Sequence, residues 1–100
     1  MRVLIKEPGK DPRRIFIPNQ LDVMQQLVGG YIEHIHYSEG VGIICDEEGK
    51  LKGKDRNFFF KDDVIVGTVL FVGDDDDMYF TDIPENAVKE IMNRMSARRK

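Results

Sequence analysis

Two histidines separated by a single residue, His34 and His36, are the side chains of this sequence best suited to chemistry. On a β-strand, residues i and i+2 project to the same side about 7 Å apart, so both imidazoles could hold a metal ion or act as a general acid and base. A zinc site needs three or four ligands, and no spacing motif connects the histidines to Cys45 or to a carboxylate. We therefore predict a polar strand face, with no bound metal and no cofactor.

Cys45 is the only cysteine, so the chain cannot form an intramolecular disulfide, and a reducing, cytoplasmic setting is expected. A cysteine nucleophile needs a neighbouring base, and the two histidines are the only candidates. Cys45 stands between Ile44 and Asp46, and no local signature links it to either histidine. We therefore predict a buried structural thiol.

Four consecutive aspartates, Asp74–Asp77, offer oxygens for Mg²⁺ or Ca²⁺. Calcium loops alternate their ligands around a shaping glycine and end with a distal glutamate. The sequence "GDDDDM" has neither that length nor that glutamate. We predict a solvated hairpin turn, whose charges also discourage the pairing of sheet edges.

The stretch from residue 54 to residue 61 combines cations with three consecutive phenylalanines, Phe58, Phe59 and Phe60. Its polar members include Lys54, Arg56, Asn57 and Lys61. Nucleotides and single-stranded nucleic acids are bound by such combinations of rings and cations, and arginine also forks onto phosphate. Because alternate residues of a strand face opposite sides, the three phenylalanines cannot all point inward, and we expect Phe59 to be exposed.

A second candidate site follows the glycine pair Gly29–Gly30. One glycine is explained by the end of a helix, where it takes positive φ without a steric clash, and this is the simpler interpretation of the pair. The other glycine indicates close packing, a tight turn, or a backbone that is open to a ligand. In the last case Tyr31 would stack on the ligand and Glu33 would hydrogen-bond to it.

The composition limits the class of protein. One hundred residues, of which 41% are hydrophobic and 33% charged, suit one domain with a single small core. The net charge of −3 provides no basic field for a nucleic acid. The longest apolar stretch, "VIVGTVLFVG", has the length of a buried strand and is far too short to span a membrane. We therefore expect no membrane association.

Turn residues and hydrophobic periodicity divide the chain into short strands and two helices. Strands are expected at residues 2–7, 13–18, 31–38, 41–45 and 64–73. The first two should form a hairpin, and the apolar strand 64–73 should be central and pair with residues 78–83. The turn "DEEG" should place Gly49 at positive φ and return along residues 50–53, and residues 54–63 should be irregular.

The first helix should begin at Asn19 as N-cap and bury an apolar stripe of Leu21, Met24, Leu27 and Val28. The last helix should begin at Asp82, with Glu85 completing a capping box. Its apolar stripe comprises Ile83, Val88, Ile91, Met92 and Met95. The order is ββαββ-ββα. We predict a single α+β domain over residues 1–100, with a mostly antiparallel sheet of about five to seven short strands and two helices.

Four stretches of the chain form a recognisable pattern: "EPGK", "LDVMQQLVGGYIE", "IICDEEGKLKG", and "IVGTVLFVG" followed by an acidic turn. Together they span most of residues 3–80, and the run "QQLVGGYIE" followed by "DEEGKL" is the most specific part. The chain resembles a small family of unknown function that is found in Firmicutes and other bacteria and in their phages and plasmids. This resemblance implies an accessory protein of a phage or mobile element. It implies no reaction, cofactor or catalytic residue.

We therefore expect a non-enzymatic binding or regulatory module that acts on a host protein or a nucleotide-like small molecule. Its predicted binding residues are Tyr31, Glu33, Arg56, Asn57 and Phe59. Tyr31 and Phe59 would supply stacking or apolar area, and Arg56 would hold an anion. Asn57 and Glu33 would set hydrogen-bond specificity.

Two alternatives remain open. A small enzyme or metal-binding protein would use His34, His36 and nearby carboxylates, either alone or with a metal ion. A nucleic-acid-binding accessory protein would show an affinity that falls steeply with added salt. An exposed edge strand could also build a homodimer, which is the commonest symmetric assembly.

Overall fold

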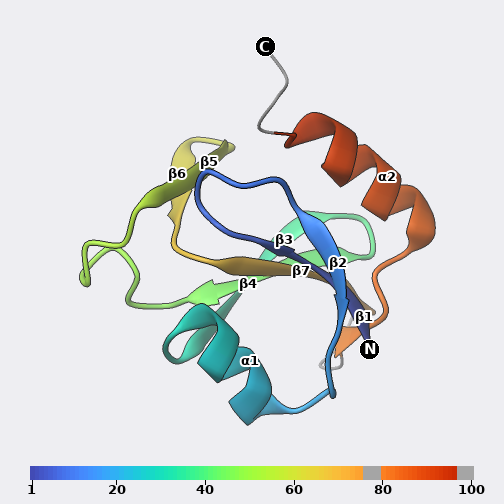
Figure 1. Cartoon of the computed structure of the whole chain (residues 1–100), viewed down its shortest axis with the longest axis horizontal. Coiled ribbons are helices and arrows are strands. Elements are labelled where there is room, and N and C mark those ends of the chain that lie inside the picture. The colour runs from blue at the N-terminus through green and yellow to red at the C-terminus, as the bar shows by residue number, and fades with distance from the viewer. Residues whose placement is uncertain (76–79, 97–100) are drawn as a thin grey trace.

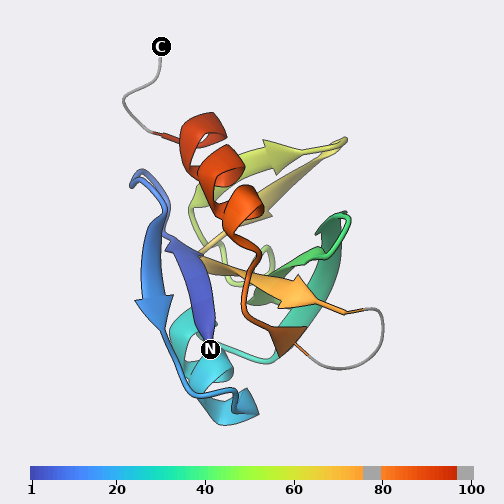
Figure 2. The same cartoon turned by 90° about the vertical axis from the view of Figure 1, so that its right-hand side faces the viewer.

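An antiparallel sheet lies between two helices, α1 on one face and α2 on the other (Figures 1 and 2). The computed structural model describes residues 1–75 and 80–96. The helices are α1 (Leu21–Val28) and α2 (Glu85–Arg94), and neither is long and apolar enough to cross a membrane. The strands are β1 (Arg2–Lys6), β2 (Arg13–Phe16), β3 (Ile32–Ser38), β4 (Val41–Asp46), β5 (Arg56–Phe60), β6 (Asp63–Val66), β7 (Val69–Asp74) and β8 (Phe80–Thr81).

The main sheet has the strand order β2-β1-β7-β4-β3, and β8 pairs with the end of β7. Each described pair of strands is antiparallel. β5 and β6 form a separate two-stranded hairpin. These findings confirm the predicted α+β class with a mostly antiparallel sheet. They also confirm the first hairpin, the central apolar strand β7 and its pairing with the segment that contains β8.

Four local predictions for residues 49–73 were wrong. The apolar run 64–73 is two strands, because Gly67 takes a φ of 76° and turns the chain between β6 and β7. Residues 54–63 are not irregular but contain β5. Residues 50–53 do not return along β4, because β3 and β7 already occupy its two edges, and positive φ in this turn belongs to Gly53 rather than Gly49.

Each face of the main sheet carries its own hydrophobic core. On one face, Phe71 of β7 belongs to a cluster that includes Ile91 of α2. On the other face, Leu70 belongs to a cluster with Met24 and Val28 of α1. Because elements cover both faces, all six residues of β4 are buried.

The start of helix α1 is joined to strand β8 by a hydrogen bond. The predicted N-cap, Asn19, donates through Nδ2 to the backbone oxygen of Phe80 at 2.9 Å, and the actual N-cap makes no side-chain hydrogen bond. Asn19 therefore joins the start of α1 to β8 and does not cap the helix. The predicted apolar stripe is confirmed at Met24 and Val28, whereas Leu21 in the first turn is exposed.

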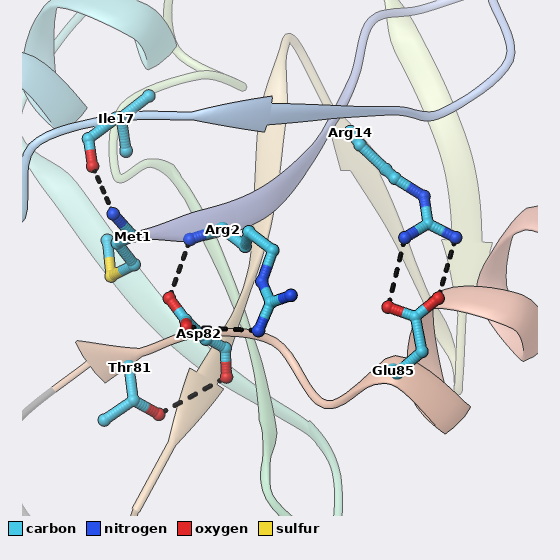
Figure 3. Close-up of polar contacts among 7 residues, drawn as sticks. All are labelled: Met1, Arg2, Arg14, Ile17, Thr81, Asp82 and Glu85. Carbon is cyan, nitrogen blue, oxygen red and sulfur yellow. Dashed lines mark hydrogen bonds and ion pairs between the residues drawn. The ribbon is translucent and has the colours of Figure 1, made fainter.

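Two arginines of the β1–β2 hairpin bind the acidic residues that the sequence suggested as caps of α2 (Figure 3). Asp82 accepts a hydrogen bond from the backbone nitrogen of Arg2 at 2.8 Å and pairs with its guanidinium at 3.3 Å. Both guanidinium NH₂ nitrogens of Arg14 donate to the Glu85 carboxylate, at 3.0 and 2.8 Å. The cap predictions were wrong because these carboxylates serve the long-range contact. The apolar stripe of α2 is confirmed by its packing into the core at Ile83, Val88, Ile91, Met92 and Met95.

The β5–β6 hairpin is fixed to the sheet by two of its three phenylalanines. The ring of Phe58 stacks on Phe71 with centroids 5.8 Å apart, and the ring of Phe60 stacks on Tyr37 at 5.2 Å. Phe59 lies between them and is 74% exposed, as the alternation of strand side chains predicted. The hairpin therefore has an anchored inner face and an outer face that carries an aromatic ring.

We expect Phe58→Ala to lower the free energy of unfolding by about 2–4 kcal/mol, because it removes a partly buried ring from its stack on Phe71. Phe59→Ala is the matched control, since it truncates a phenylalanine whose ring is exposed to solvent. It should change stability by less than about 0.5 kcal/mol. Urea denaturation measures both values. Equal losses in the two variants would contradict this packing of the hairpin.

Candidate functional site

A pocket of about 170 Å³ lies where β3 and β4 meet the turn after β4 and strand β6. We call it the Glu33 pocket. Ile35, Ile65 and Val66 provide apolar wall, and Cys45 is also part of the lining. Charged residues line it as well, namely Glu33, Asp46, Glu47, Lys50 and Asp63.

The alternation of side chains along β3 places Glu33 at this pocket. Glu33, Ile35 and Tyr37 project to one face of the sheet, and Ile35 and Tyr37 pack into the core on that face. Glu33 lies nearer the beginning of the strand and is exposed. Tyr31, just before the strand, is 68% exposed. The covered part of this face therefore ends at Ile35, and Tyr31 and Glu33, both predicted to bind a ligand, lie outside it.

Cys45 lies on the pocket face, and the histidines lie on the opposite face. The register pairs Glu33 with Cys45 and His34 with Ile44, and side chains of directly paired residues share a face. Burial raises the pKa of the Cys45 thiol to about 11, and the nearby negative charges of Glu33 and Asp46 act in the same direction. The predicted burial of the Cys45 thiol is thus confirmed.

The charges of the Glu33 pocket are unevenly compensated. Lys50 pairs with Asp63 at 2.5 Å. Within residues 1–75 and 80–96, neither Glu33 nor Glu47 takes part in an ion pair. The lining of the pocket therefore combines two acidic residues that have no cationic partner in the described structure with an apolar wall.

Next to the pocket, a buried carboxylate joins the turn after β4 to the end of α1. The Oδ2 atom of Asp46 lies 2.8 Å from the Nζ atoms of both Lys52 and Lys54. The same two lysines donate to backbone oxygens at the end of the helix, Lys52 to Gly29 at 3.0 Å and Lys54 to Val28 at 2.7 Å. We call this group of Asp46, Lys52 and Lys54 the Asp46 clamp.

The clamp accounts for both glycines of the pair that follows α1. Gly29 has a φ of 87° and ends the helix, with its N–H bonded to the oxygen of Gln25. A Cβ atom at Gly30 would lie 2.6 Å from both Asp46 Oδ1 and Lys52 Nζ, so only glycine leaves room for the clamp. Close packing, one of the open interpretations of the second glycine, is therefore its role.

The side chain of Asp46 is only 1% exposed, yet it is held in the charged form. Burial alone would raise its pKa. Hydrogen bonds from Lys52, Lys54 and the backbone N–H of Glu48 outweigh that effect and hold the pKa well below its usual range. Sequence reasoning missed this group. Its signal was the joint presence of "LVGG" and "DEEGKLK", which meet at the clamp.

The other predicted binding residues do not gather around the Glu33 pocket. Asn57 binds inside the fold, where it accepts from Lys6 Nζ at 2.8 Å and donates to the backbone oxygens of Lys6 and Gly67, each at 2.8 Å. Arg56 and Phe59 are exposed on β5. Arg56 makes no ion pair with the described residues.

His34 has a carboxylate partner that the sequence did not reveal. Its Nε2 atom lies 2.9 Å from Oδ2 of Asp74, and its ring meets Phe80 edge-on at 5.1 Å between centroids. Asp74 is the last residue of β7. The hairpin turn predicted for Asp74–Asp77 includes residues 76 and 77, which lie outside the described residues. His36 is exposed. No cluster of metal-binding side chains is found within the described residues.

Comparison with protein-family models gives one finding. Residues 1–96 match the model described as "Domain of unknown function (DUF3846)". Neither the search of curated proteins nor the search of solved structures found a match.

We expect Asp46→Asn to lower the free energy of unfolding near neutral pH by about 1.5–3 kcal/mol, because it removes the negative charge that Lys52 and Lys54 both bind. Asp63→Asn makes the same change at the exposed pair with Lys50 and should leave stability unchanged. Thermal unfolding of both variants and the wild type measures the difference.

The difference in stability between the wild type and Asp46→Asn should depend on pH. The folded pKa of Asp46 is depressed, so its stabilisation is complete above about pH 4, the unfolded value, and is lost as the pH falls below it. The difference in Tm between wild type and Asp46→Asn should therefore narrow as the pH is lowered from about 6 to about 2. A difference that stays constant across this range would contradict a charged Asp46 in the clamp.

Proposed function

This chain belongs to the family described as a domain of unknown function (DUF3846), and from that premise we propose that it is a non-enzymatic binding or regulatory module that acts on a protein partner. We further propose that it is an accessory protein of a bacterial phage or mobile element and that its partner belongs to the host. The resemblance of its motifs to proteins of phages and plasmids supports that setting.

The observation that carries the proposal is the exposed ring of Phe59. Its neighbours in the chain, Phe58 and Phe60, are stacked on the core and hold β5 in one orientation. Phe59 is directly paired with Val64 of β6, so their side chains share the outer face of the hairpin. An aromatic ring on a rigid element costs little conformational entropy when it is buried by a partner.

Arg56, at the beginning of the same strand, adds the second residue type that dominates interface energetics. Aromatic and arginine side chains are enriched among the few residues that carry most of the binding energy at protein interfaces. Arg56 is exposed and is not engaged in any ion pair with the described residues. We call Arg56, Phe59 and Val64 the hairpin surface.

The sizes and charges of the hollows favour a protein over a nucleotide-like ligand. The Glu33 pocket measures about 170 Å³, below the roughly 300 Å³ at which small-molecule sites begin. Its lining includes Glu33 and Glu47, whose negative charges would repel phosphate. A wider hollow beside the end of α1 is an open groove, which would leave much of a small ligand in water. A projecting ring such as Phe59 is instead suited to a pocket on the partner.

The test begins with the chain purified from its own bacterial host and mass spectrometry of the proteins that remain bound to it. Each such protein is then produced alone, and its affinity is measured for the wild type and for three variants. We expect Phe59→Ala and Arg56→Ala each to weaken binding at least about tenfold, or 1.4 kcal/mol. Leu51→Ala, which removes a side chain that is 86% exposed in the turn after β4, is the control and should change affinity less than about twofold.

Two results would contradict the proposal. One is a partner whose affinity for Phe59→Ala and Arg56→Ala equals that for Leu51→Ala. The other is a nucleotide that raises the thermal midpoint of the wild type while no protein binds, which would assign the chain to small-molecule recognition.

A further inference from the structure

The sheet has one open edge that is long and unprotected. β3 comes last in the strand order, and among the described residues only β4 pairs with it. Its seven residues, Ile32–Ser38, contain no proline and no lysine, and its pairing with β4 is regular up to His36. The opposite edge strand, β2, is only four residues long and begins with two arginines. Pro12 precedes it and Pro18 follows shortly after it, and all of these features discourage the pairing of a further strand.

Two residues of this edge strand, Glu33 and Ile35, line the Glu33 pocket. Cross-strand neighbours on one face of a sheet lie about 5 Å apart, so a strand added to β3 would place one of its side chains next to Glu33. That side chain would face the same side as the pocket, whereas its two neighbours along the added strand would face the histidine side. The edge and the pocket together therefore select one side chain out of an extended segment.

The chemistry of the pocket specifies which side chain this is. The apolar wall of Ile35, Ile65 and Val66 suits a hydrocarbon stem. Glu33 and Glu47 offer two carboxylates that lack an ion pair among the described residues, and Lys50 is already bound to Asp63. An aliphatic stem that ends in a cation satisfies both parts.

We propose that β3 binds an extended peptide segment of a partner protein as an additional strand, with one lysine or arginine of that segment in the Glu33 pocket. Backbone hydrogen bonds to β3 supply affinity, and the basic side chain supplies specificity. Tyr31, 68% exposed just before the strand, adds a ring that can pack against the cation. This proposal does not rest on Arg56 or Phe59 of the hairpin surface, and Val64 is the one residue of that surface that also lines the pocket.

The probe is a set of synthetic peptides taken from a selection of random linear sequences on the purified chain. Each peptide is made with its basic residue intact and with that residue replaced by norleucine, which keeps the stem and removes the charge. Fluorescence polarisation gives Kd for the wild type, for Glu33→Gln and for Glu39→Gln. The last variant removes the same charge from the exposed turn between β3 and β4, outside the pocket.

We expect norleucine to weaken binding to the wild type at least about tenfold, and Glu33→Gln to weaken the basic peptide by a similar factor. Glu33→Gln should leave the norleucine peptide unchanged, and Glu39→Gln should leave both unchanged. Phe59→Ala should also leave peptide affinity unchanged, which separates this site from the proposed function. Hydrogen exchange should show new protection of backbone amides in β3 when the peptide binds, with none in β2.

Three results would overturn the proposal. The first is a selection that yields only peptides without lysine or arginine. The second is an equal loss of affinity in Glu33→Gln and Glu39→Gln, which would reduce the effect to overall charge. The third is an affinity that rises several-fold when residues 97–100, "ARRK", are removed, which would assign the pocket to the chain's own basic tail.

Discussion

The contact between the buried carboxylate of Asp46 and two lysines is the constraint on which the rest of the structure depends. A charged carboxylate with 1% of its side chain exposed is unfavourable unless cations and N–H groups surround it. Lys52 and Lys54 meet that need, and at the same time they donate to the last carbonyls of α1. That helix has no basic residue in its own last turn, so the turn after β4 supplies the positive charge that its C-terminus favours.

This arrangement also explains where the chain requires glycine. The stem of Lys54 runs between the end of α1 and the junction of β6 and β7. A Cβ atom at Gly29 would lie 2.7 Å from its Nζ, and one at Gly67 would lie 2.8 Å from its Cδ. Both glycines also have positive φ, so each is needed for backbone conformation and for space. The division of the apolar run 64–73 into two strands is therefore linked to the clamp, because the chain turns at the point where Lys54 passes.

What the sequence revealed was local, and what it concealed was long-range. Strand alternation correctly predicted that Phe59 is exposed, and helical spacing correctly predicted that Met24 and Val28 are buried. The clamp could not be derived, because Asp46 opens the turn-like sequence "DEEG", and the two lysines that bind it are themselves held by carbonyls at the end of a helix near residue 28. The caps failed for the same physical reason. Asn19 and Asp82 each have the chemistry of an N-cap, but each is bonded to a partner distant in sequence: Asn19 donates to the backbone oxygen of Phe80, and Asp82 accepts from Arg2. The candidate site was found only in part, since Glu33 was predicted while Glu47 and Lys50 were not.

Two features of the surface are not required by the fold, and they lie next to each other. The ring of Phe59 is exposed, so the core would be complete without it. Edge strand β2 is protected by its short length, its arginines and the flanking prolines, whereas edge strand β3 has none of these features. Strand β6 carries Val64 beside Phe59 and also lines the Glu33 pocket. The turn that lines the pocket on its other side begins at the Asp46 clamp, and the stacks of Phe58 and Phe60 fix the hairpin. Both proposed surfaces are thus held by rigid, internally satisfied contacts, which is the condition under which exposed groups can bind without a large ordering cost.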